Sequence, residues 1–352
     1  MKYYKYKIIL LMLFPILISC QDSVTNTDKP EGDWLIPVTE VYDGGPGKDG
    51  IPAISKPIFL ENELLNYMED DDLIIGVKIG KIIRGYTHPV LNWHEIINDQ
   101  IGENYFSVTY CPLTGSTIGI NRKINNEVTT LGVSGLLYNS NLIPYDRATN
   151  SNWSQMKMKC VNGELKGKDF EFVSTFETSW KTWKKIFPKA LVISANSGFS
   201  RDYSVYPYGD YRREENLYFP VTNVNRDIHL KERVHGIIEG ENVYAFRFNL
   251  FGSQTKLVQK EIAGNRYLIV GNKDDNFMVS FYNNLLNGTE LNFEIVEDAL
   301  PIILKDSEGN KWDIFGYAVE GDRTGERLVP TKSFIAYWFA WGAFYKNVSI
   351  IQ

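Results

Sequence analysis

Cysteine and histidine are scarce in this chain. Its 352 residues include three cysteines and four histidines, too few thiols for the disulfide framework of a small secreted protein. The sequence also lacks a glycine-rich phosphate loop, an H-E-x-x-H motif and an acidic calcium loop, so the common sequence signatures of those three kinds of site are absent. Acidic residues outnumber basic ones, which gives a net charge of −6, and we therefore expect no nucleic-acid partner.

A hydrophobic run long enough to cross a bilayer is also missing near the N-terminus. The apolar stretch there runs only from Ile8 to Ile18, whereas a transmembrane helix needs about 20 residues. Lysines precede this stretch and Leu17-Ile-Ser-Cys20 forms its end, the order found in a bacterial lipoprotein signal peptide.

This pattern predicts a lipid-anchored protein of the bacterial cell envelope. We expect residues 1–19 to be a signal peptide, Cys20 to carry fatty acyl chains such as palmitate, and residues 20–55 to be a flexible tether. The protein would then face the periplasm or the exterior, with the membrane as a partner. A signal peptide cut at another bond, with Cys20 incidental, is the alternative.

What the chain does contain is an internal repeat. Seven residues recur in the same order 158 to 160 positions later: Asp146 as Asp306, Trp153 as Trp312, Gly163 as Gly321, Phe176 as Phe334, Trp180 as Trp338, Trp183 as Trp341, and Phe187 as Tyr345. The offset between the matching residues changes by only two positions, which requires only two single-residue deletions. We therefore expect residues 70–195 and 231–352 to be two pseudo-symmetric repeats of one folding unit. Asp146 recurs, so we expect it to cap a turn.

Four apolar residues near the end of each repeat follow helical spacing. Phe176, Trp180, Trp183 and Phe187 stand at i, i+4, i+7 and i+11, which places them on one face of a helix. Such stripes are usually buried. The pattern predicts a helix in each repeat that packs its tryptophans against a sheet.

Most of the remaining pattern is typical of β-structure. Residues 73–86 contain two β-rich runs about Gly80-Lys81, and residues 234–246 have the same form, so a hairpin is expected in each repeat. A short helix should follow Thr87, with Ile97 and Ile101 on the same face as His94. Strands are expected near residues 105–110, 116–121, 127–133, 142–146, 153–158, 170–174 and 190–194. Short turns favour antiparallel pairing, so the expected fold class is α+β, predominantly antiparallel β.

The connector between the repeats, residues 196–230, is rich in tyrosine and arginine. It is longer than a connection without secondary structure usually is, and such segments are commonly packed or functional. We expect it to pack on the first repeat, with Arg201 and Tyr203 among the residues that face a ligand; a plain structural brace is the alternative.

Several polar residues occur in the first repeat without counterparts in the second, and they are the candidates for a site. Gly271 falls where Cys111 would recur, and no histidine recurs from the segment 88–99. The candidates in the first repeat are His88, His94, Cys111, Tyr138, Asn139, Arg147 and Gln155. We expect them to converge on one pocket, with His235 at its rim.

Four ordered motifs carry a family resemblance. They are residues 88–99, residues 108–116 around Cys111-Pro-Leu-Thr114, residues 132–141, and residues 145–155. These segments resemble the bacterial family known as domain of unknown function 3179, and the resemblance extends from about residue 70 to the end. The resemblance implies kinship without an established activity. Many members have a second cysteine at the position of Thr114, and its replacement removes the C-x-x-C pair that a metal or redox site would use.

Three interpretations of the site remain open at this point. Cys111 can be a catalytic nucleophile activated by His94 or His88. The same thiol with His88, His94 and His235 can bind a soft metal, zinc or copper. Alternatively, Cys111 and His94 are buried structural residues. The remaining donors suit an anionic or polyhydroxylated small molecule. The sequence thus predicts an envelope lipoprotein that binds a small polar molecule or a metal in the first repeat, with an enzyme or a purely structural component as the alternatives.

Overall fold

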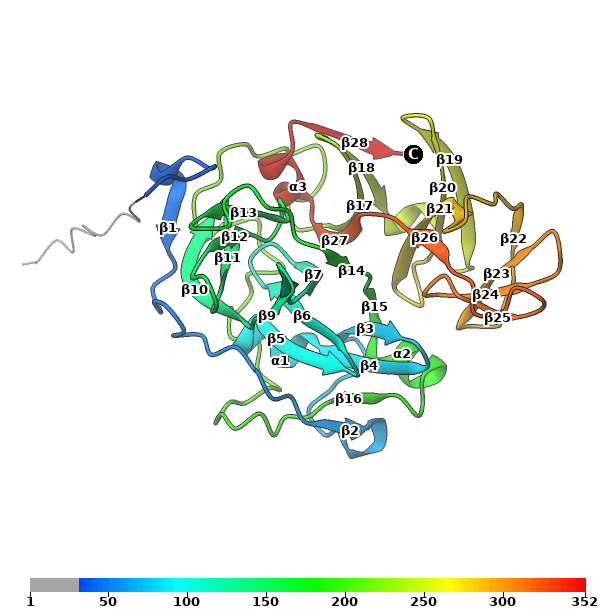
Figure 1. Ribbon diagram of the computed structural model, residues 1–352, viewed down its shortest axis with the longest axis horizontal. Helices are drawn as coiled ribbons and strands as arrows, with labels where there is room; N and C mark the ends of the chain where they lie inside the picture. The colour runs from blue at the N-terminus through cyan, green and yellow to red at the C-terminus, as the bar shows by residue number, and fades with distance from the viewer. Residues whose placement is uncertain (1–31) are drawn as a thin grey trace, which may run out of the picture.

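The computed structural model describes residues 32–352, and within them the fold is mostly antiparallel β-sheet with three short α-helices (Figure 1). This confirms the predicted α+β class dominated by antiparallel strands. In the same residues no helix is both long and apolar enough to cross a bilayer. The predicted signal peptide, Cys20 and the start of the predicted tether lie outside the described residues. The prediction of a flexible tether as far as residue 55 was wrong, because Val41–Asp43 pairs with Leu136–Tyr138 and Ile54 is buried.

The first half of the chain begins with a sheet in the order β15-β3-β4-β16-β2. The hairpin predicted around Gly80-Lys81 is confirmed, because β3 pairs antiparallel with β4 across this turn. Strand β15 pairs antiparallel with β3, and β16 runs parallel to β4. The strands are β2 (Phe59–Glu61), β3 (Leu73–Ile79), β4 (Ile82–Thr87), β15 (Phe176–Ser179) and β16 (Leu191–Ile193).

Two further sheets complete the first half, in the orders β14-β7-β6-β5 and β1-β10-β11-β12-β13. The first contains β5 (Ile96–Ile101), β6 (Asn104–Cys111), β7 (Ser116–Asn121) and β14 (Phe172–Val173). The second contains β1 (Val41–Asp43), β10 (Leu131–Tyr138), β11 (Asn141–Asp146), β12 (Asn152–Ser154) and β13 (Lys159–Asn162). A small ribbon joins β8 (Lys123–Ile124) to β9 (Glu127–Val128).

The second half has three sheets, in the orders β27-β17-β18-β28, β19-β20-β21-β26 and β22-β23-β24-β25. The first contains β17 (Arg233–Glu239), β18 (Asn242–Arg247), β27 (Ser333–Tyr337) and β28 (Asn347–Ile351). The second contains β19 (Lys256–Ile262), β20 (Asn265–Asn272), β21 (Phe277–Leu285) and β26 (Leu328–Pro330). The third contains β22 (Phe293–Ile295), β23 (Ile302–Asp306), β24 (Lys311–Asp313) and β25 (Ala318–Glu320).

The helices are shorter than the sequence pattern predicted. They are α1 (His88–His94), α2 (Trp180–Ile186) and α3 (Trp338–Phe344); single 3-10 turns occur at Val38–Glu40, Asn62–Leu64 and Phe248–Leu250. The four-residue stripe is not one helix, because Phe176 lies in β15 and Phe187 follows the end of α2. Burial of the stripe is nevertheless confirmed: Phe176, Trp180, Trp183 and Phe187 are at most 7% exposed.

The expected helix after Thr87 also ends early. The Thr87 hydroxyl accepts the Val90 backbone N–H at 3.5 Å and starts α1, but Glu95 then adopts a positive φ of 57°. A left-handed residue ends a helix, and Ile97 and Ile101 consequently lie in β5. The prediction that they share a helical face with His94 was wrong.

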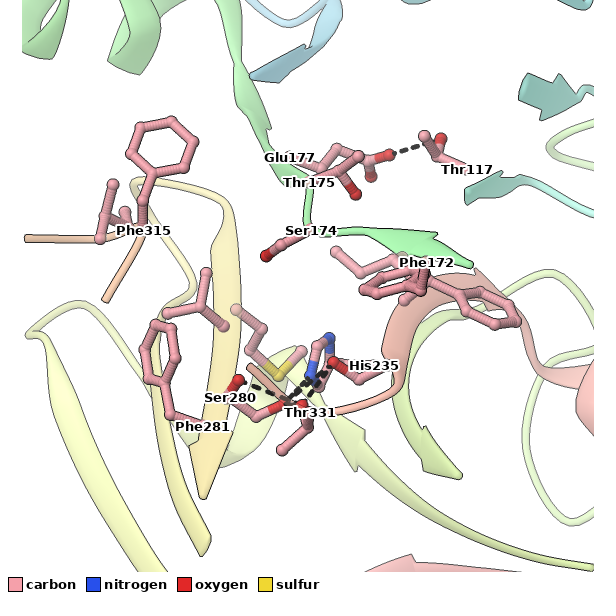
Figure 2. A pocket seen from close by; sticks show the side chains of 16 residues that line it. Thr117, Phe172, Ser174, Thr175, Glu177, His235, Ser280, Phe281, Phe315 and Thr331 are labelled. Atoms are coloured by element: carbon pink, nitrogen blue, oxygen red, sulfur yellow. Dashed lines mark hydrogen bonds between the residues drawn. The ribbon is translucent and has the colours of Figure 1, made fainter. Parts of the chain in front are cut away.

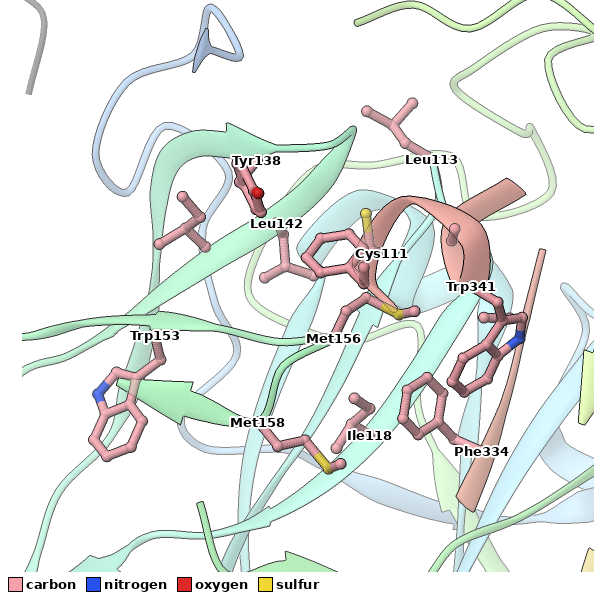
Figure 3. Packing of buried hydrophobic residues seen from close by; sticks show 14 of the residues in the cluster. Cys111, Leu113, Ile118, Tyr138, Leu142, Trp153, Met156, Met158, Phe334 and Trp341 are labelled. Atoms are coloured by element: carbon pink, nitrogen blue, oxygen red, sulfur yellow. The ribbon is translucent and has the colours of Figure 1, made fainter. Parts of the chain in front are cut away.

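The two halves share their hydrophobic cores. Trp183 packs in one cluster with Phe315 and Phe277 of the second half. Trp338 and Trp341 belong to another cluster with Cys111 and Ile118 of the first half, and Figure 3 shows Trp341, Cys111 and Ile118 in it. Close approach of the tryptophans depends on glycine, since a Cβ on Gly236 would lie 2.5 Å from the Trp341 ring and one on Gly76 would lie 2.8 Å from Trp183. Removal of either half would therefore expose the core of the other.

The connector, residues 196–230, contains no strand or helix and packs on the first half. The Tyr211 hydroxyl donates to the Leu113 carbonyl at 2.9 Å, and the Ser140 hydroxyl donates to the Phe219 carbonyl at 2.9 Å. Tyr211 is completely buried. The connector thus lies directly over the end of β6, where Cys111 is located.

Candidate functional site

A small cavity lined by both polar and apolar side chains lies between the two halves of the molecule (Figure 2). Its volume is about 30 Å³, enough for about two water molecules. Thr117 of β7, Glu177 of β15 and the segment between β14 and β15 form the wall from the first half. Strands β17, β21 and β27 supply the opposite wall. The cavity exists only because the halves pack together.

His235 and three hydroxyl groups form the wall from the second half. The His235 Nε2 atom lies 2.8 Å from the Ser280 hydroxyl oxygen, which is 2.5 Å from that of Thr331 and 3.0 Å from that of Ser333. His235 is 4% exposed. These side chains meet because β17 pairs with β27, with His235 opposite Ile335, and because Thr331 contacts β21 through the Ser280 carbonyl.

The other ring nitrogen of His235 has no hydrogen-bond partner within residues 32–352. Burial lowers the pKa of His235 to about 4, so its imidazole is neutral at physiological pH. A neutral imidazole donates from one nitrogen and accepts at the other. The free Nδ1 atom is therefore able to form one hydrogen bond with a bound molecule, and buried polar groups without partners are uncommon in folded proteins.

Glu177 is the charged group of the first-half wall. Its carboxylate lies 3.0 Å from His88 Nε2, accepts from the Thr117 hydroxyl at 3.2 Å, and forms an ion pair with Arg233. Burial alone would raise its pKa, but Arg233 and the neighbouring His88 lower that pKa to about 2. Glu177 is therefore ionised and held in place, and it joins β15 of the first half to β17 of the second.

Cys111 lies elsewhere, in the hydrophobic core (Figure 3). Its thiol donates to the Ser140 carbonyl at 3.6 Å and is 1% exposed. Burial raises the pKa of Cys111 to about 11, so it is a thiol at neutral pH. Histidine is not among its hydrogen-bond partners in the described chain. The geometry therefore does not provide the activated thiolate that nucleophilic catalysis needs.

Gln155 belongs to a closed polar network beside Cys111. Its Oε1 atom accepts from Ser116 at 2.7 Å and from Asn141 at 2.7 Å, while its amide donates to Thr109 at 2.9 Å. Thr114, the residue at the second cysteine position of the resemblance, accepts from Asn141 at 2.9 Å. These buried groups satisfy one another, and the network is an internal brace between β6, β7 and β11.

His94 has a third, separate environment. Its Nδ1 atom lies 2.7 Å from the Pro52 carbonyl and its Nε2 atom 2.6 Å from the Tyr203 hydroxyl. Burial lowers its pKa. Arg201 stacks 5.5 Å from the centre of the Trp93 ring. Here the connector does contact predicted site residues, since Tyr203 binds His94 directly.

The remaining predicted ligand residues are not brought together. Asn139 accepts from the backbone and hydroxyl of Thr222, both at 2.9 Å, and Tyr138 packs edge-on against Phe344. Arg147 forms a bidentate pair with Asp49 at the surface, with contacts of 2.7 and 2.8 Å. The three side chains therefore contact three different parts of the chain, at Thr222, Phe344 and Asp49.

A family model matches residues 48–348, and its description is a protein of unknown function, DUF3179. The chain belongs to this family. The match covers both halves and the connector, so the cavity between the halves falls wholly within the family region. No curated protein and no solved structure matches the chain.

The candidate metal ligands His88, His94, Cys111 and His235 do not converge on one position. Within residues 32–352 no group of three or more His, Cys, Asp or Glu side chains is placed to hold a metal ion. His88 binds Glu177, His94 binds Tyr203, Cys111 binds a carbonyl and His235 binds Ser280. The described structure of this DUF3179 protein thus brings His88 and His235 to one region, near Glu177, and leaves His94 and Cys111 apart from it.

Sequence reasoning missed the polar residues of the cavity other than His235, among them Glu177, Ser280, Thr331 and Ser333. One signal was present, because Thr331 and Ser333 stand two positions apart, as residues on one face of an extended segment do. Glu95, a polar residue of the first repeat that was not among the final site candidates, is buried with a positive φ of 57°. Burial raises the pKa of Glu95 to about 7, and its carboxyl contacts only the Tyr208 hydroxyl, at 3.5 Å, among the described side chains.

Proposed function

We propose that this protein is a lipid-anchored component of the bacterial envelope that binds a small polar molecule in the cavity between its two halves. The observation that carries the proposal is the unpartnered Nδ1 atom of His235, a buried group that lines the cavity. Binding a molecule there would supply its missing hydrogen bond. The proposed site therefore lies at the junction of the halves, whereas the sequence predicted a pocket within the first repeat.

The lining specifies the chemistry of the ligand. The hydroxyls of Ser280 and Thr331 and the ionised Glu177 can accept hydrogen bonds, while His235 Nδ1 accepts or donates according to the tautomer of the ring. A small molecule with N–H or O–H donors and one acceptor oxygen therefore fits. An anion is disfavoured, because it would lie beside the buried Glu177 carboxylate, whose charge is already paired with Arg233. The volume of about 30 Å³ restricts the ligand to a few non-hydrogen atoms.

The size also limits the affinity. The best small ligands gain about 1.5 kcal/mol per non-hydrogen atom, so a molecule of four such atoms binds with at most about 6 kcal/mol, a Kd of tens of micromolar. Urea and formamide are suitable probes, since both are small, neutral and rich in N–H donors.

The membrane anchor is the second part of the proposal. Its support is the order of charges, apolar stretch and Leu17-Ile-Ser-Cys20 in the sequence. We also infer that the two halves arose by duplication of one unit. The corresponding strand orders β15-β3-β4-β16 and β27-β17-β18-β28 support this inference, as do the paired residues Asp146 with Trp153 and Asp306 with Trp312.

Binding can be tested through the imidazole nitrogens themselves. We expect urea or formamide to shift the ¹⁵N resonance of His235 Nδ1 with saturation at millimolar concentration or below, and the shifting signal to be lost in His235→Asn. The ring of His229, which is 45% exposed, is the internal control and should not shift with saturation. Absence of any saturable change at His235 with both probes would reject the binding proposal.

A further inference from the structure

A groove on the surface of the first half is apolar at its floor and basic at its rim. It has a volume of about 440 Å³ and is lined by the tip of the β3–β4 hairpin, the end of α2 and the start of β16; strands β3, β4 and β16 and helix α2 lie near one another in the lower part of Figure 1. Ile82 and Leu191 are 49% and 40% exposed there. Large apolar side chains that gather at an exposed site commonly mark an interaction surface.

Lysines surround this groove. Lys81 and Lys189 line it, no acidic residue does, and the exposed Lys185 is on α2 beside Ile186. None of these three lysines forms an ion pair with another residue in the part of the chain that the structure describes. They gather in the fold although the whole chain has a net charge of −6.

The acidic groups of the adjoining elements do not neutralise these lysines. Asp70 pairs with Lys184 at 2.7 Å, so its charge is balanced by a different lysine. Glu61 lies opposite Leu191 in the β2–β16 ladder and forms no ion pair within residues 32–352. Three basic side chains therefore remain free around exposed apolar groups.

We propose that this basic-rimmed groove docks on an anionic membrane surface, with Lys81, Lys185 and Lys189 at the lipid headgroups and Ile82 and Leu191 between them. Surface lysines attract anionic lipid, and each contributes about fivefold to binding. Long lysine side chains reach headgroups while neighbouring apolar groups enter the interface. The biological setting of this docking rests on the proposed lipid anchor, which would hold the groove near the membrane.

The test uses the chain from Gln21 onward, without acyl groups, so that its result does not depend on whether Cys20 is acylated. Sedimentation with vesicles of phosphatidylglycerol and phosphatidylcholine is compared with vesicles of phosphatidylcholine alone. We expect at least about tenfold stronger binding to the anionic vesicles, and a decrease when salt is added.

The decisive variant replaces the three rim lysines, Lys81→Glu, Lys185→Glu and Lys189→Glu. The matched control makes the same charge change at the exposed Lys256, Lys260 and Lys273 of the second half, which lie outside the groove. We expect the rim variant to lose at least about tenfold in binding to anionic vesicles, and the control to keep most of its affinity. All six lysines are exposed, so thermal unfolding of both variants should match that of the parent.

Three results would overturn the proposal. They are an absence of binding to anionic vesicles, an equal loss in the rim and control variants, and self-association that Ile82→Ser abolishes while vesicle binding is unchanged. The last result would make the groove a contact between copies of the chain. Because the acyl chain is absent throughout, failure here leaves the separate experiment on Cys20 unaffected.

Discussion

Asp306 accepts a hydrogen bond at 2.9 Å from the indole of Trp312, and both side chains are buried. The same relationship joins Asp146 to Trp153 at 3.1 Å in the first half. Each aspartate also holds a turn: Asp306 accepts the backbone N–H groups of Glu308 and Asn310, and Asp146 accepts that of Thr149 at 2.8 Å. The predicted turn-capping role of Asp146 is thereby explained, because the carboxylate satisfies several buried donors at once.

Replacement of Asp306 by alanine should be strongly destabilising. The indole N–H of Trp312 and the amide of Asn310 would lose their acceptor in a buried site, and we expect a loss of about 2–4 kcal/mol in the free energy of unfolding. Urea unfolding measures this change. Asp322→Ala, at an exposed acid of the same half, is the control and should change stability by less than about 0.5 kcal/mol. Equal effects of the two substitutions would contradict the assigned role.

The spacing of such residues explains what could be predicted from the sequence. Hairpins follow from local alternation, and the burial of Trp180 and Trp338 follows from their spacing, so these were predicted correctly. The extent of each helix was not predicted correctly. Phe176 continues the apolar spacing of the helix, but it pairs with Gly76 in a sheet. A helical pattern and a strand that leads into a helix look alike over a few residues.

The site was harder to predict, since its parts are distant in sequence. His235 was recognised as a candidate, but Ser280 lies 45 positions away from it and Thr331 a further 51. Only the packing of β21 against β17 and β27 brings these residues together. Conversely, the polar residues around Gln155 looked like a ligand site, but their donors and acceptors satisfy one another.

Both tryptophans of the predicted stripes should be important for stability. Trp338 is fully buried and Trp180 is 4% exposed, so Trp338→Ala and Trp180→Ala should each cost about 3–5 kcal/mol, the range for large truncations in a core. Trp93→Ala provides the comparison, since Trp93 is only partly buried. The change is measured by chemical denaturation. A loss below about 1 kcal/mol at either core position would show that the surrounding structure does not depend on the ring.

Cys20→Ser tests the location of the protein. If Cys20 is acylated, the substitution should prevent labelling with a radioactive fatty acid and move the protein from the membrane fraction to the soluble fraction. One acyl chain gives only marginal attachment, so stable anchoring requires several chains. Cys160→Ser, at a cysteine in the folded core, is the control and should leave labelling unchanged. Membrane attachment of Cys20→Ser at high salt would reject the lipoprotein assignment.

Glu95→Gln should make the protein more stable at neutral and alkaline pH. Burial raises the pKa of Glu95 from 4.5 to about 7 in the folded state. Below pH 4.5 the carboxyl is protonated in both states, so the variant and the parent should have similar stabilities. As the pH rises from 4.5 to about 7, the unfolded chain ionises first, and the parent loses about 3 kcal/mol relative to the variant.

This difference should reach a plateau above about pH 7, where Glu95 ionises in the folded state as well. Burial lowers the pKa of His235 to about 4, so His235 makes stability rise with pH, opposite to Glu95. This effect is the same in the parent and in Glu95→Gln, and it cancels when their stabilities are subtracted. Urea unfolding of both proteins across this pH range measures the effect. The left-handed backbone at Glu95 is available to glutamine at similar cost, so strain does not distinguish the two side chains. A difference that stays constant from pH 4.5 to pH 7 would mean that the Glu95 carboxylate is solvated or paired with a cation.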